Sequence, residues 1–457
     1  MSWERKAKKY SGVELVKDSI KSDDLRKKIL QLTSEYFDLV HKKKEFIPSE
    51  TFVAASSKVL DRNDLNNLVD SSLDLWLTAG RYADEFEKKL PKKFGTKFAS
   101  STVSGSAANL LAFSALTSDY FEDKKIKDGD EVITVAAGFP TTVAPIIHNR
   151  CVPVYLDVDL ETCNIKTESL KKALTKKTKA VFLAHTLGNP FDLDIISDFC
   201  EENELFLIED CCDAFGSKFD GKTVGSFGNF ASLSFYPAHH ITTGEGGAVL
   251  YNDYKMKRIV ESFRDWGRDC WCQTGMNNTC GKRYSWKLGD LPKGYDHKFV
   301  YSHVGYNMKI TDIQAALGCS QLDKVDRFIQ KRKDNFSYMM KRFLDEKLDK
   351  YFILPEKHPK ADPSWYGFLL TIKNNKKINR NELVSYLNSK KILTRLLFAG
   401  NLTKQPGYMN KKHKIIGNLK NTDKIMSDTF WVGVWPGLDK NQLDYIVAEI
   451  KNYILKI

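Results

Sequence analysis

The organisation of this chain is clearest in residues 234–247, which read Ser234-Phe235-Tyr236-Pro237-Ala238-His239-His240, then Ile241-Thr242-Thr243, then Gly244-Glu245-Gly246-Gly247. Short apolar runs flank this stretch, with Ala231–Phe235 at its start and Gly247–Tyr251 at its end. Both runs have the length and composition of buried strands. Tyr236 is therefore expected just past the end of a strand.

Further candidate strands precede this stretch and alternate with helical segments. The strands are Glu131–Val135, Val152–Leu156, Ala180–Ala184 and Leu205–Ile208, and the helices include Ser106–Leu116 and Leu193–Glu202. Such alternation predicts an α/β protein with a mostly parallel sheet and helices on both faces. Ligands of such sheets bind at the carboxyl ends of the strands, where Asp210 and Tyr236 are expected.

The length of 457 residues predicts more than one domain. Residues 1–60 are expected to be an N-terminal helical segment, with an apolar stripe from Leu25 to Leu39. Residues 61–344 are expected to form the large domain, and residues 345–457 a smaller C-terminal α+β domain.

Residues 264–306 break the alternating pattern. They are rich in Gly, Trp, Tyr and Cys and have no clear period, which predicts a long functional loop. A helix from Thr311 to about Leu344 is expected to follow it.

The composition is that of a soluble globular protein, with 42% hydrophobic and 28% charged residues. No apolar run is long enough to span a membrane, and residues 1–10 lack the apolar core of a signal peptide, so we expect a cytoplasmic protein. The net charge is +12, but the lysines are scattered along the chain, which indicates a solvated surface and no nucleic-acid partner. An anionic small molecule fits this charge equally well.

Two polar motifs can bind an anionic cofactor. Ser104-Gly105-Ser106 opens a predicted helix, where small residues let backbone N–H groups approach a phosphate, although a simple helix cap explains the motif equally well. Ser234 is a second candidate phosphate ligand. Asp210 ends a buried strand and can pair with a protonated pyridine nitrogen, or it can cap a loop.

Three other residues are candidates near the same strand ends. Phe139 follows a strand and can stack on an aromatic ring, although a core role is the commoner one. Asn307, after Tyr306, can give polar contacts to a cofactor, including across a dimer interface. His239 can act as a base, because an imidazole titrates near neutral pH. His240 would point elsewhere on an extended chain and is expected to be structural.

The cysteine count is nine, which is odd and argues against a disulfide framework in a cytosolic chain. Cys212, Cys270, Cys272 and Cys280 follow the spacing Cys-x57-Cys-x-Cys-x7-Cys. Four thiolates can hold a 2Fe–2S cluster or a zinc ion, and the spacing does not separate these options from unconnected core cysteines.

These motifs resemble the DegT/DnrJ/EryC1/StrS sugar aminotransferase family, of the fold-type I pyridoxal phosphate enzymes, from about Gly80 to Tyr445. Within it, the chain resembles the group of 3-dehydrases for CDP-4-keto-6-deoxy-D-glucose. That group carries histidine where the aminotransferases have the lysine that forms a Schiff base, together with a four-cysteine 2Fe–2S site at this spacing. An imidazole cannot make that bond, so the cofactor is expected to bind untethered, as pyridoxamine 5′-phosphate (PMP).

The resemblance implies roles for individual residues. It makes His239 the catalytic base, Asp210 the partner of the pyridine nitrogen, and Asp213 and Tyr236 residues that line the site. It makes the four cysteines cluster ligands. Arg395 is a candidate contact for a substrate phosphate.

The resemblance also implies partners and an activity. These are a CDP-sugar substrate, an NAD(P)H-dependent iron–sulfur flavin reductase and a second copy in a homodimer, with a role in making 3,6-dideoxyhexoses for lipopolysaccharide O-antigens. The alternatives are a cluster-free dehydratase of the GDP-4-keto-6-deoxymannose type and an inactive scaffold with zinc on the cysteines. An ordinary aminotransferase would need another lysine at the cofactor, such as Lys218 or Lys222.

Overall fold

The computed structural model describes residues 19–42, 44–272 and 275–457. A twisted eight-stranded sheet forms its centre, in the order β1-β9-β8-β5-β4-β2-β3-β13. β9 is antiparallel to both of its neighbours, and the remaining pairs are parallel. The strands are β1 (Phe98–Thr102), β2 (Glu131–Val135), β3 (Val152–Leu156), β4 (Thr178–Ala184), β5 (Phe206–Asp210), β8 (Phe230–Ser234), β9 (Gly247–Tyr251) and β13 (Lys414–Ile415).

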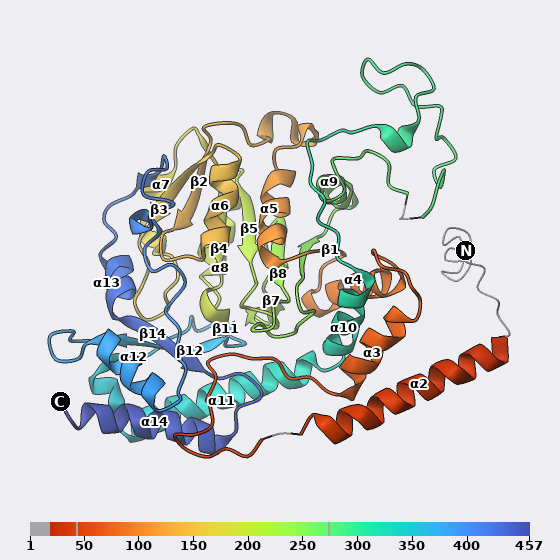
Figure 1. Ribbon diagram of the computed structural model, residues 1–457. Coiled ribbons are helices and arrows are strands. Elements are labelled where there is room, and N and C mark those ends of the chain that lie inside the picture. The colour runs from red at the N-terminus through yellow and green to blue at the C-terminus, as the bar shows by residue number, and fades with distance from the viewer. Residues whose placement is uncertain (1–18, 43, 273–274) are drawn as a thin grey trace.

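Helices cover both faces of this sheet, as the alternating pattern predicts (Figure 1). They are α4 (Arg81–Phe94), α5 (Gly105–Ala115), α6 (Pro140–His148), α7 (Leu170–Ala173), α8 (Leu193–Glu202), α9 (Tyr254–Arg264) and α10 (Asp312–Leu322). The strands are almost wholly buried, so the sheet is the middle layer of a three-layer α/β arrangement.

A second, antiparallel sheet carries the smaller part of the molecule. It has the order β10-β12-β14 and packs against α11, α12 and α14 around a separate apolar core. These elements are β10 (Phe352–Ile353), β12 (Gly367–Ile372), β14 (Thr429–Gly433), α11 (Val325–Asp345), α12 (Arg380–Ser389) and α14 (Lys440–Ile454). A short helix, α13 (Lys420–Asp428), and a minor sheet of β6 (Lys218–Phe219), β7 (Lys222–Thr223) and β11 (Ala361–Asp362) complete the fold.

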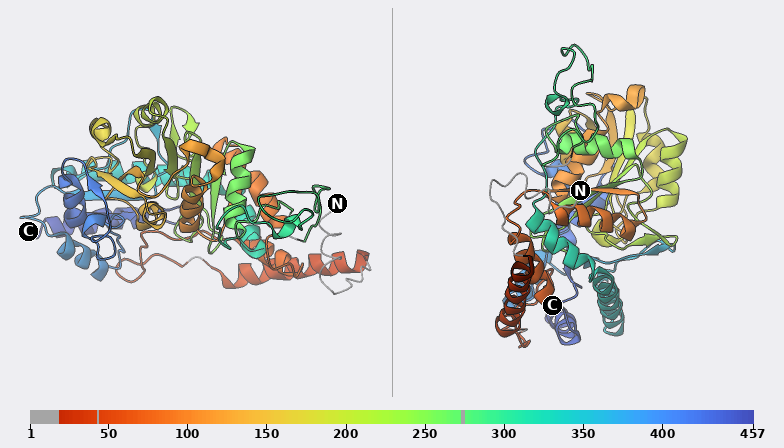
Figure 2. Two further views of the ribbon diagram at one scale, coloured as in Figure 1. Left: turned by 90° about the horizontal axis from the view of Figure 1, so that it is seen from above. Right: turned by 90° about the vertical axis from the view of Figure 1, so that its right-hand side faces the viewer.

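The N-terminal prediction is only partly right. α2 (Ser19–Val40) is helical, as is α3 (Arg62–Ser72), but residues 44–60 contain no helix. Pro48 disfavours helix there, and Val53 instead pairs with Ile392 and enters the smaller core. The expectation for residues 1–18 lies outside the described residues. The apolar stripe of α2 is exposed, and the helix extends beyond the body of the molecule (Figure 2).

The helix expected from Thr311 to about Leu344 is also two helices. α10 ends at Leu322 and α11 begins at Val325, with Lys324 between them bound to Asp61 and Asp64. α10 packs against α3 and α4, whereas α11 packs against α14, so the chain changes direction where no Gly or Pro marks a break.

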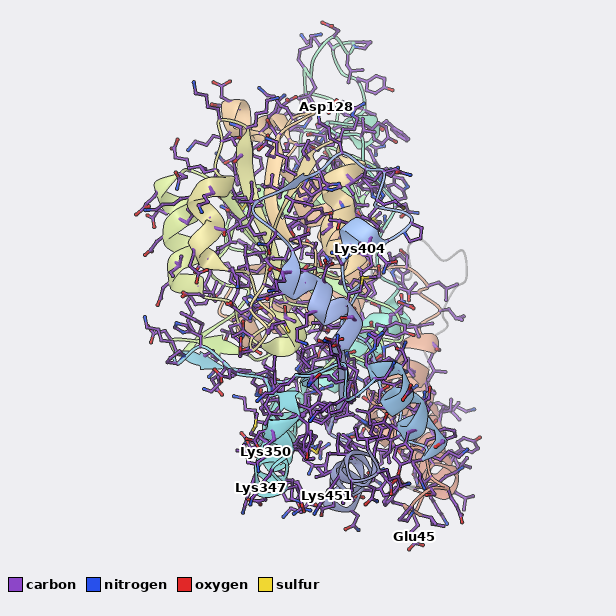
Figure 3. The ribbon with its side chains drawn as sticks, turned by 90° about the vertical axis from the view of Figure 1, so that its left-hand side faces the viewer. Glu45, Asp128, Lys347, Lys350, Lys404 and Lys451 are labelled. Carbon is purple, nitrogen blue, oxygen red and sulfur yellow. The ribbon has the colours of Figure 1, made fainter. Side chains whose placement is uncertain are left out.

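The charge is spread over the surface. In Figure 3, Lys404 lies near the middle of the molecule, while Lys347, Lys350 and Lys451 lie near its lower end. Lys404 and Lys451 pair with Asp423 and Glu346. No helix in the described part of the chain has the length and apolar character needed to cross a bilayer.

Candidate active site

A cavity of about 480 Å³ lies between the carboxyl ends of the large sheet and the smaller domain. This volume suits a cofactor-sized molecule. The predicted residues that line it are Ser104, Gly105, Ser106, Phe139, Asp210, Cys212, Asp213, Ser234, Tyr236, His239 and Arg395. Among the residues that the structure describes, no lysine lines this cavity. Lys218 and Lys222 lie in the β6–β7 hairpin, away from it.

The first turn of α5 forms one end of the cavity. The Ser104 side chain caps the helix by accepting a hydrogen bond from the N–H of Ala107 at 3.1 Å, so the capping interpretation of this serine is realised. A Cβ built on Gly105 would lie 2.4 Å from the Cβ of Ser234. Glycine is therefore required for the close approach of the helix start to β8. The small residues and the positive helix end make a cradle that fits a phosphate.

Asp210 ends β5 with its carboxylate inside the cavity. One carboxylate oxygen accepts hydrogen bonds from Asn109 Nδ2 at 2.8 Å and Thr142 Oγ1 at 2.7 Å, and the other accepts from the N–H of Cys212 at 3.1 Å. These three donors fix the direction of the carboxylate. A fixed, buried carboxylate at this place fits a protonated pyridine nitrogen.

His239 lies in the loop after β8. Its Nδ1 is 3.2 Å from Asp213 Oδ1, which is an ion-pair distance without good hydrogen-bond geometry. Its ring centre is 5.4 Å from that of Tyr366, a buried tyrosine of the smaller domain. Because Asp213 lies against Nδ1, Nε2 is the ring nitrogen left for proton transfer.

Arg332 donates a hydrogen bond to the backbone of the loop that carries His239. It is fully buried, and its guanidinium donates to the backbone carbonyls of His239 at 3.4 Å and Tyr366 at 3.2 Å. Burial lowers the pKa of Arg332 to about 10. His240, the residue after His239, is buried, and its Nε2 lies 2.9 Å from the carbonyl oxygen of Ser364, as expected for a structural residue.

Four predicted residues do not line this cavity within one chain. They are Asn307, Cys270, Cys272 and Cys280. Cys270 and Cys272 line a different cavity, of about 590 Å³, between α4, α9 and the loop that follows α9. In the part of the chain that the structure describes, no group of potential metal ligands contains Cys212 together with these cysteines, so the four-cysteine site stays a prediction.

The potential ligand atoms of His185, Glu209 and Cys211 lie within 4.8 Å of one another, but this grouping has a structural explanation. Glu209 is fully buried, and burial acts to raise its pKa. The hydrogen bonds from His185 and from backbone N–H groups outweigh that effect, and the pKa of Glu209 is lowered. The carboxylate is therefore satisfied by the protein itself.

Several cavity residues escaped sequence reasoning. Asn109 in α5 and Thr142 in α6 bind Asp210, although they lie 101 and 68 residues away from it along the chain. Tyr366 and Trp431 come from the smaller domain. Contacts between segments that are far apart in the sequence leave no local sequence pattern. The position of Asn109 in the first turns of α5, close to Ser104-Gly105-Ser106, is the one hint that it lies near the cavity.

The three-layer fold and the cavity at the strand ends define a pyridoxal-phosphate-dependent enzyme of fold type I. The chain belongs to the DegT/DnrJ/EryC1/StrS aminotransferase family, whose model matches residues 58–451.

Two similar proteins cover nearly the whole chain. The lipopolysaccharide biosynthesis protein RfbH of Salmonella typhimurium is 50% identical over 94% of this chain and 98% of its own length. The dTDP-4-dehydro-2,6-dideoxy-D-glucose 3-dehydratase of Saccharopolyspora spinosa is 46% identical over 95% of this chain and 93% of its own length.

Solved structures give the same picture. The Escherichia coli GDP-4-keto-6-deoxy-D-mannose-3-dehydratase with bound hydrated PLP has a TM-score of 0.78 and 29% identity, over 87% of this chain and 99% of its own. The aminotransferase from Psychrobacter cryohalolentis, at 23% identity and a TM-score of 0.77 over 89% of this chain and all of its own, shares the fold.

Proposed function

We propose that this chain is a PMP-dependent 3-dehydrase of CDP-4-keto-6-deoxy-D-glucose, which works in the synthesis of 3,6-dideoxyhexoses for lipopolysaccharide O-antigen. The observation that carries the proposal is the presence of His239, and the absence of any lysine among the described residues that line the cavity. Without a lysine, the cofactor stays untethered and the site favours proton transfer over amino transfer.

The names of the relatives support the reaction type. Two of them are 3-dehydratases of nucleotide sugars, and RfbH is named for lipopolysaccharide biosynthesis. The nucleotides printed for the dehydratases are dTDP and GDP, so CDP rests on the resemblance alone and is the finer part of the proposal. Competition between CDP, dTDP and GDP for the substrate-free protein measures it directly.

The residues divide the work as follows. When bound, PMP would supply an amine for the 4-keto carbon of the sugar and a ring that can take up electrons. His239 Nε2 would take the proton from the C4′ methylene of PMP as the hydroxyl on sugar carbon 3 leaves, while Asp213 lies at the Nδ1 side of the imidazole. Asp210 would pair with the protonated ring nitrogen. Arg395, which lines the cavity, is the proposed contact for a substrate phosphate.

The remaining partners belong to this proposal as well. The resemblance implies a homodimer and an NAD(P)H-dependent iron–sulfur flavin reductase, and we also propose a cytoplasmic location. Cys212, Cys270, Cys272 and Cys280 are the proposed 2Fe–2S ligands. Within one chain, Cys212 lines the first cavity, whereas Cys270 and Cys272 line the second.

The test is solvent deuterium exchange at the PMP methylene, followed by NMR. His239→Asn should bind PMP but lose exchange by about 100-fold or more, the usual contribution of a general base. His358→Asn is the matched control, because His358 pairs with Asp192 at 3.7 Å, outside the cavity. Unchanged exchange in His239→Asn would remove this histidine from the mechanism.

A second candidate function is a cluster-free dehydratase of the type printed for the Escherichia coli and Yersinia pseudotuberculosis relatives. The separation of Cys212 from the other three cysteines favours it. Iron and sulfide analysis of anaerobically purified protein separates the two candidates. Zinc without iron, and no bound cofactor, would instead support an inactive scaffold.

A further inference from the structure

The helix α2 carries an apolar stripe that the rest of the described chain leaves exposed. The stripe consists of Leu25, Ile29, Leu32, Tyr36 and Leu39, whose exposed fractions lie between 39% and 71%. None of these residues lines the cofactor cavity, and α2 precedes the residues 58–451 that match the family model. The stripe therefore needs an explanation apart from the proposed function.

Ion pairs with α3 fix the orientation of α2. Arg26, near the start of α2, binds Asp70, near the end of α3, at 2.6 Å. Asp38, near the end of α2, binds Arg62, at the start of α3, at 3.1 Å. The two helices thus lie side by side in opposite directions and are joined at both ends, so the direction in which the stripe points is set by the fold.

The stripe lies on a different side of α2 from the contacts with α3. The half-buried residues of α2 are Arg26, Leu30, Thr33, Ser34 and Phe37, and Arg26 and Ser34 bond to α3. Four of these five follow a stripe residue by one position, which turns them by about 100° around the helix. Because α2 also extends beyond the body of the molecule, its stripe is open to another protein (Figure 2).

The spacing of the stripe is that of a two-helix contact. Its residues recur at intervals of four, three, four and three positions, which is a heptad repeat. In a heptad written abcdefg, the three leucines take position d, and Ile29 and Tyr36 take position a. An exposed helix with apolar residues at a and d buries them most simply against a second helix of the same pattern.

The charges beside the stripe fit a second copy of α2. Lys28 and Glu35 take position g, at the edge of the stripe. In an antiparallel pair that places Ile29 against Leu32 of the second copy, Lys28 lies beside Glu35 of the second copy. Two-fold symmetry repeats this pair of opposite charges on the other half of the contact. The surface is therefore complementary to itself.

Other arrangements of two α2 helices lose this match. A shift by one heptad in either direction places Lys28 or Glu35 against itself, and a parallel pair brings no opposite charges together across the stripe. In the favoured register the like-charged pair is Lys21 with Lys42, and Lys42 lies beyond the end of α2. Charge thus selects both the direction and the register of the pair.

The charge balance of α2 favours a protein partner over a membrane surface. A helix that lies on a membrane carries a polar side rich in Lys and Arg. In α2 basic and acidic residues are equal in number: Lys21, Arg26, Lys27 and Lys28 against Asp23, Asp24, Glu35 and Asp38. Such a helix has no net attraction to anionic lipid.

We propose that two copies of this chain join through α2, with the two stripes packed as a short antiparallel coiled coil. The contact lies outside the part of the chain that matches the family model, and it adds no residue to the cofactor cavity. It therefore goes beyond the proposed function, and cofactor binding does not depend on it.

The test is charge reversal in the full-length chain. Lys28→Glu and Glu35→Lys each turn two attractive pairs into two repulsive ones. The dissociation constant of the assembly, measured by sedimentation at low salt, should rise by about tenfold in either variant. Co-expressed with different affinity tags and purified as a mixed assembly, the two variants place opposite charges together again at both positions. The mixed assembly should be as strong as the wild type.

Two further variants complete the experiment. Lys27→Glu makes the same change of charge at position f, where the side chain is 80% exposed and points away from the stripe, and should leave the dissociation constant unchanged. Leu32→Asp puts a charge inside the stripe and should raise the constant by about 100-fold or more. It should also speed hydrogen exchange in residues 21–40. PMP binding by each variant shows that it has folded.

The outcomes separate the possible partners of α2. A mixed assembly of Lys28→Glu and Glu35→Lys chains that is as weak as either variant alone would overturn the proposal. A Leu32→Asp protein that assembles as the wild type does would overturn it as well. If that variant also loses binding to vesicles of anionic phospholipid that the wild type shows, the stripe belongs to a membrane surface instead.

Discussion

Gly105→Ala tests whether the start of α5 binds the cofactor phosphate. A Cβ at this position would lie 2.4 Å from Ser234 Cβ and 3.0 Å from Cys212 Sγ, and real Cβ contacts essentially never fall below 3.0 Å. Either the helix start or β8 must therefore move by roughly half an ångström. The N–H groups of the first turn move with it.

The expected loss follows from the hydrogen bonds involved. A hydrogen bond to a charged group contributes about 1.5–3 kcal/mol, and each 1.4 kcal/mol is a factor of ten in affinity. If one phosphate bond is lost, the Kd for PMP should rise by about 10- to 100-fold. Equilibrium dialysis of PMP against the purified protein measures this.

Gly407→Ala is the control, because a Cβ at Gly407 meets no heavy atom within 4 Å. It should leave the Kd unchanged. The thermal unfolding midpoint of each variant without PMP separates loss of binding from loss of folding. If Gly105→Ala folds and binds PMP as the wild type does, the phosphate does not bind at α5.

Three other perturbations follow from contacts in the structure. Asp213→Asn should keep PMP but slow exchange at its methylene by about tenfold or more, because His239 loses the carboxylate at its Nδ1; Asp194→Asn, on an exposed pair with Lys360, should not, and equal rates in both would refute a positioning role. Thr142→Val removes one donor to Asp210 and should destabilise the protein by about 1 kcal/mol in urea unfolding while weakening PMP binding; binding at wild-type strength would separate Asp210 from the cofactor. Burial acts to raise the pKa of Asp70, but hydrogen bonds from Arg26, Tyr82 and Arg81 outweigh it and the pKa is lowered. The stabilisation of α2 by the Arg26–Asp70 ion pair is thus complete above the ordinary carboxyl pKa of about 4 and is lost as the pH falls through the lowered value. Hydrogen exchange in residues 21–40 should therefore rise in acid, and Arg26→Ala should show the same rise at pH 7. Protection of these residues that persists until the large sheet unfolds would contradict this.

The buried strands were the most predictable part of the fold. β2, β3 and β9 have the bounds that the apolar runs predict, because a strand covered on both faces reads as a continuous apolar run. β1 was missed, since its sequence Phe98-Ala99-Ser100-Ser101-Thr102 is polar although buried. Its hydroxyl groups are paired inside the protein, as Ser101 Oγ is with Glu87, and sequence alone does not show such partners.

The candidate site was predictable where one local motif supplied it. Ser104, Asp210 and His239 each end or follow a strand, and parallel strands bring their ends to one edge. The cysteines could not be placed in this way. Spacing along the chain gives the number of thiolates, but it does not say where the loop between α9 and α10 lies. That depends on contacts such as those of Arg258 Nη2 with the carbonyl of Asp269 and of the Asp269 carboxylate with His297 Nε2.

The segment that carries Arg395 ties the two domains together. Arg395 pairs with Trp431 of β14 in the smaller domain. Further along the chain, the N–H of Leu402 donates to the carbonyl of Ala136, and β13 pairs with β3 of the large sheet. The two domains that enclose the cavity are thereby linked by backbone hydrogen bonds. Swinging one domain away from the other would break the pairing of β13 with β3 at the edge of the large sheet. We therefore expect the two domains to stay together and a ligand to enter the cavity by movement of side chains and loops.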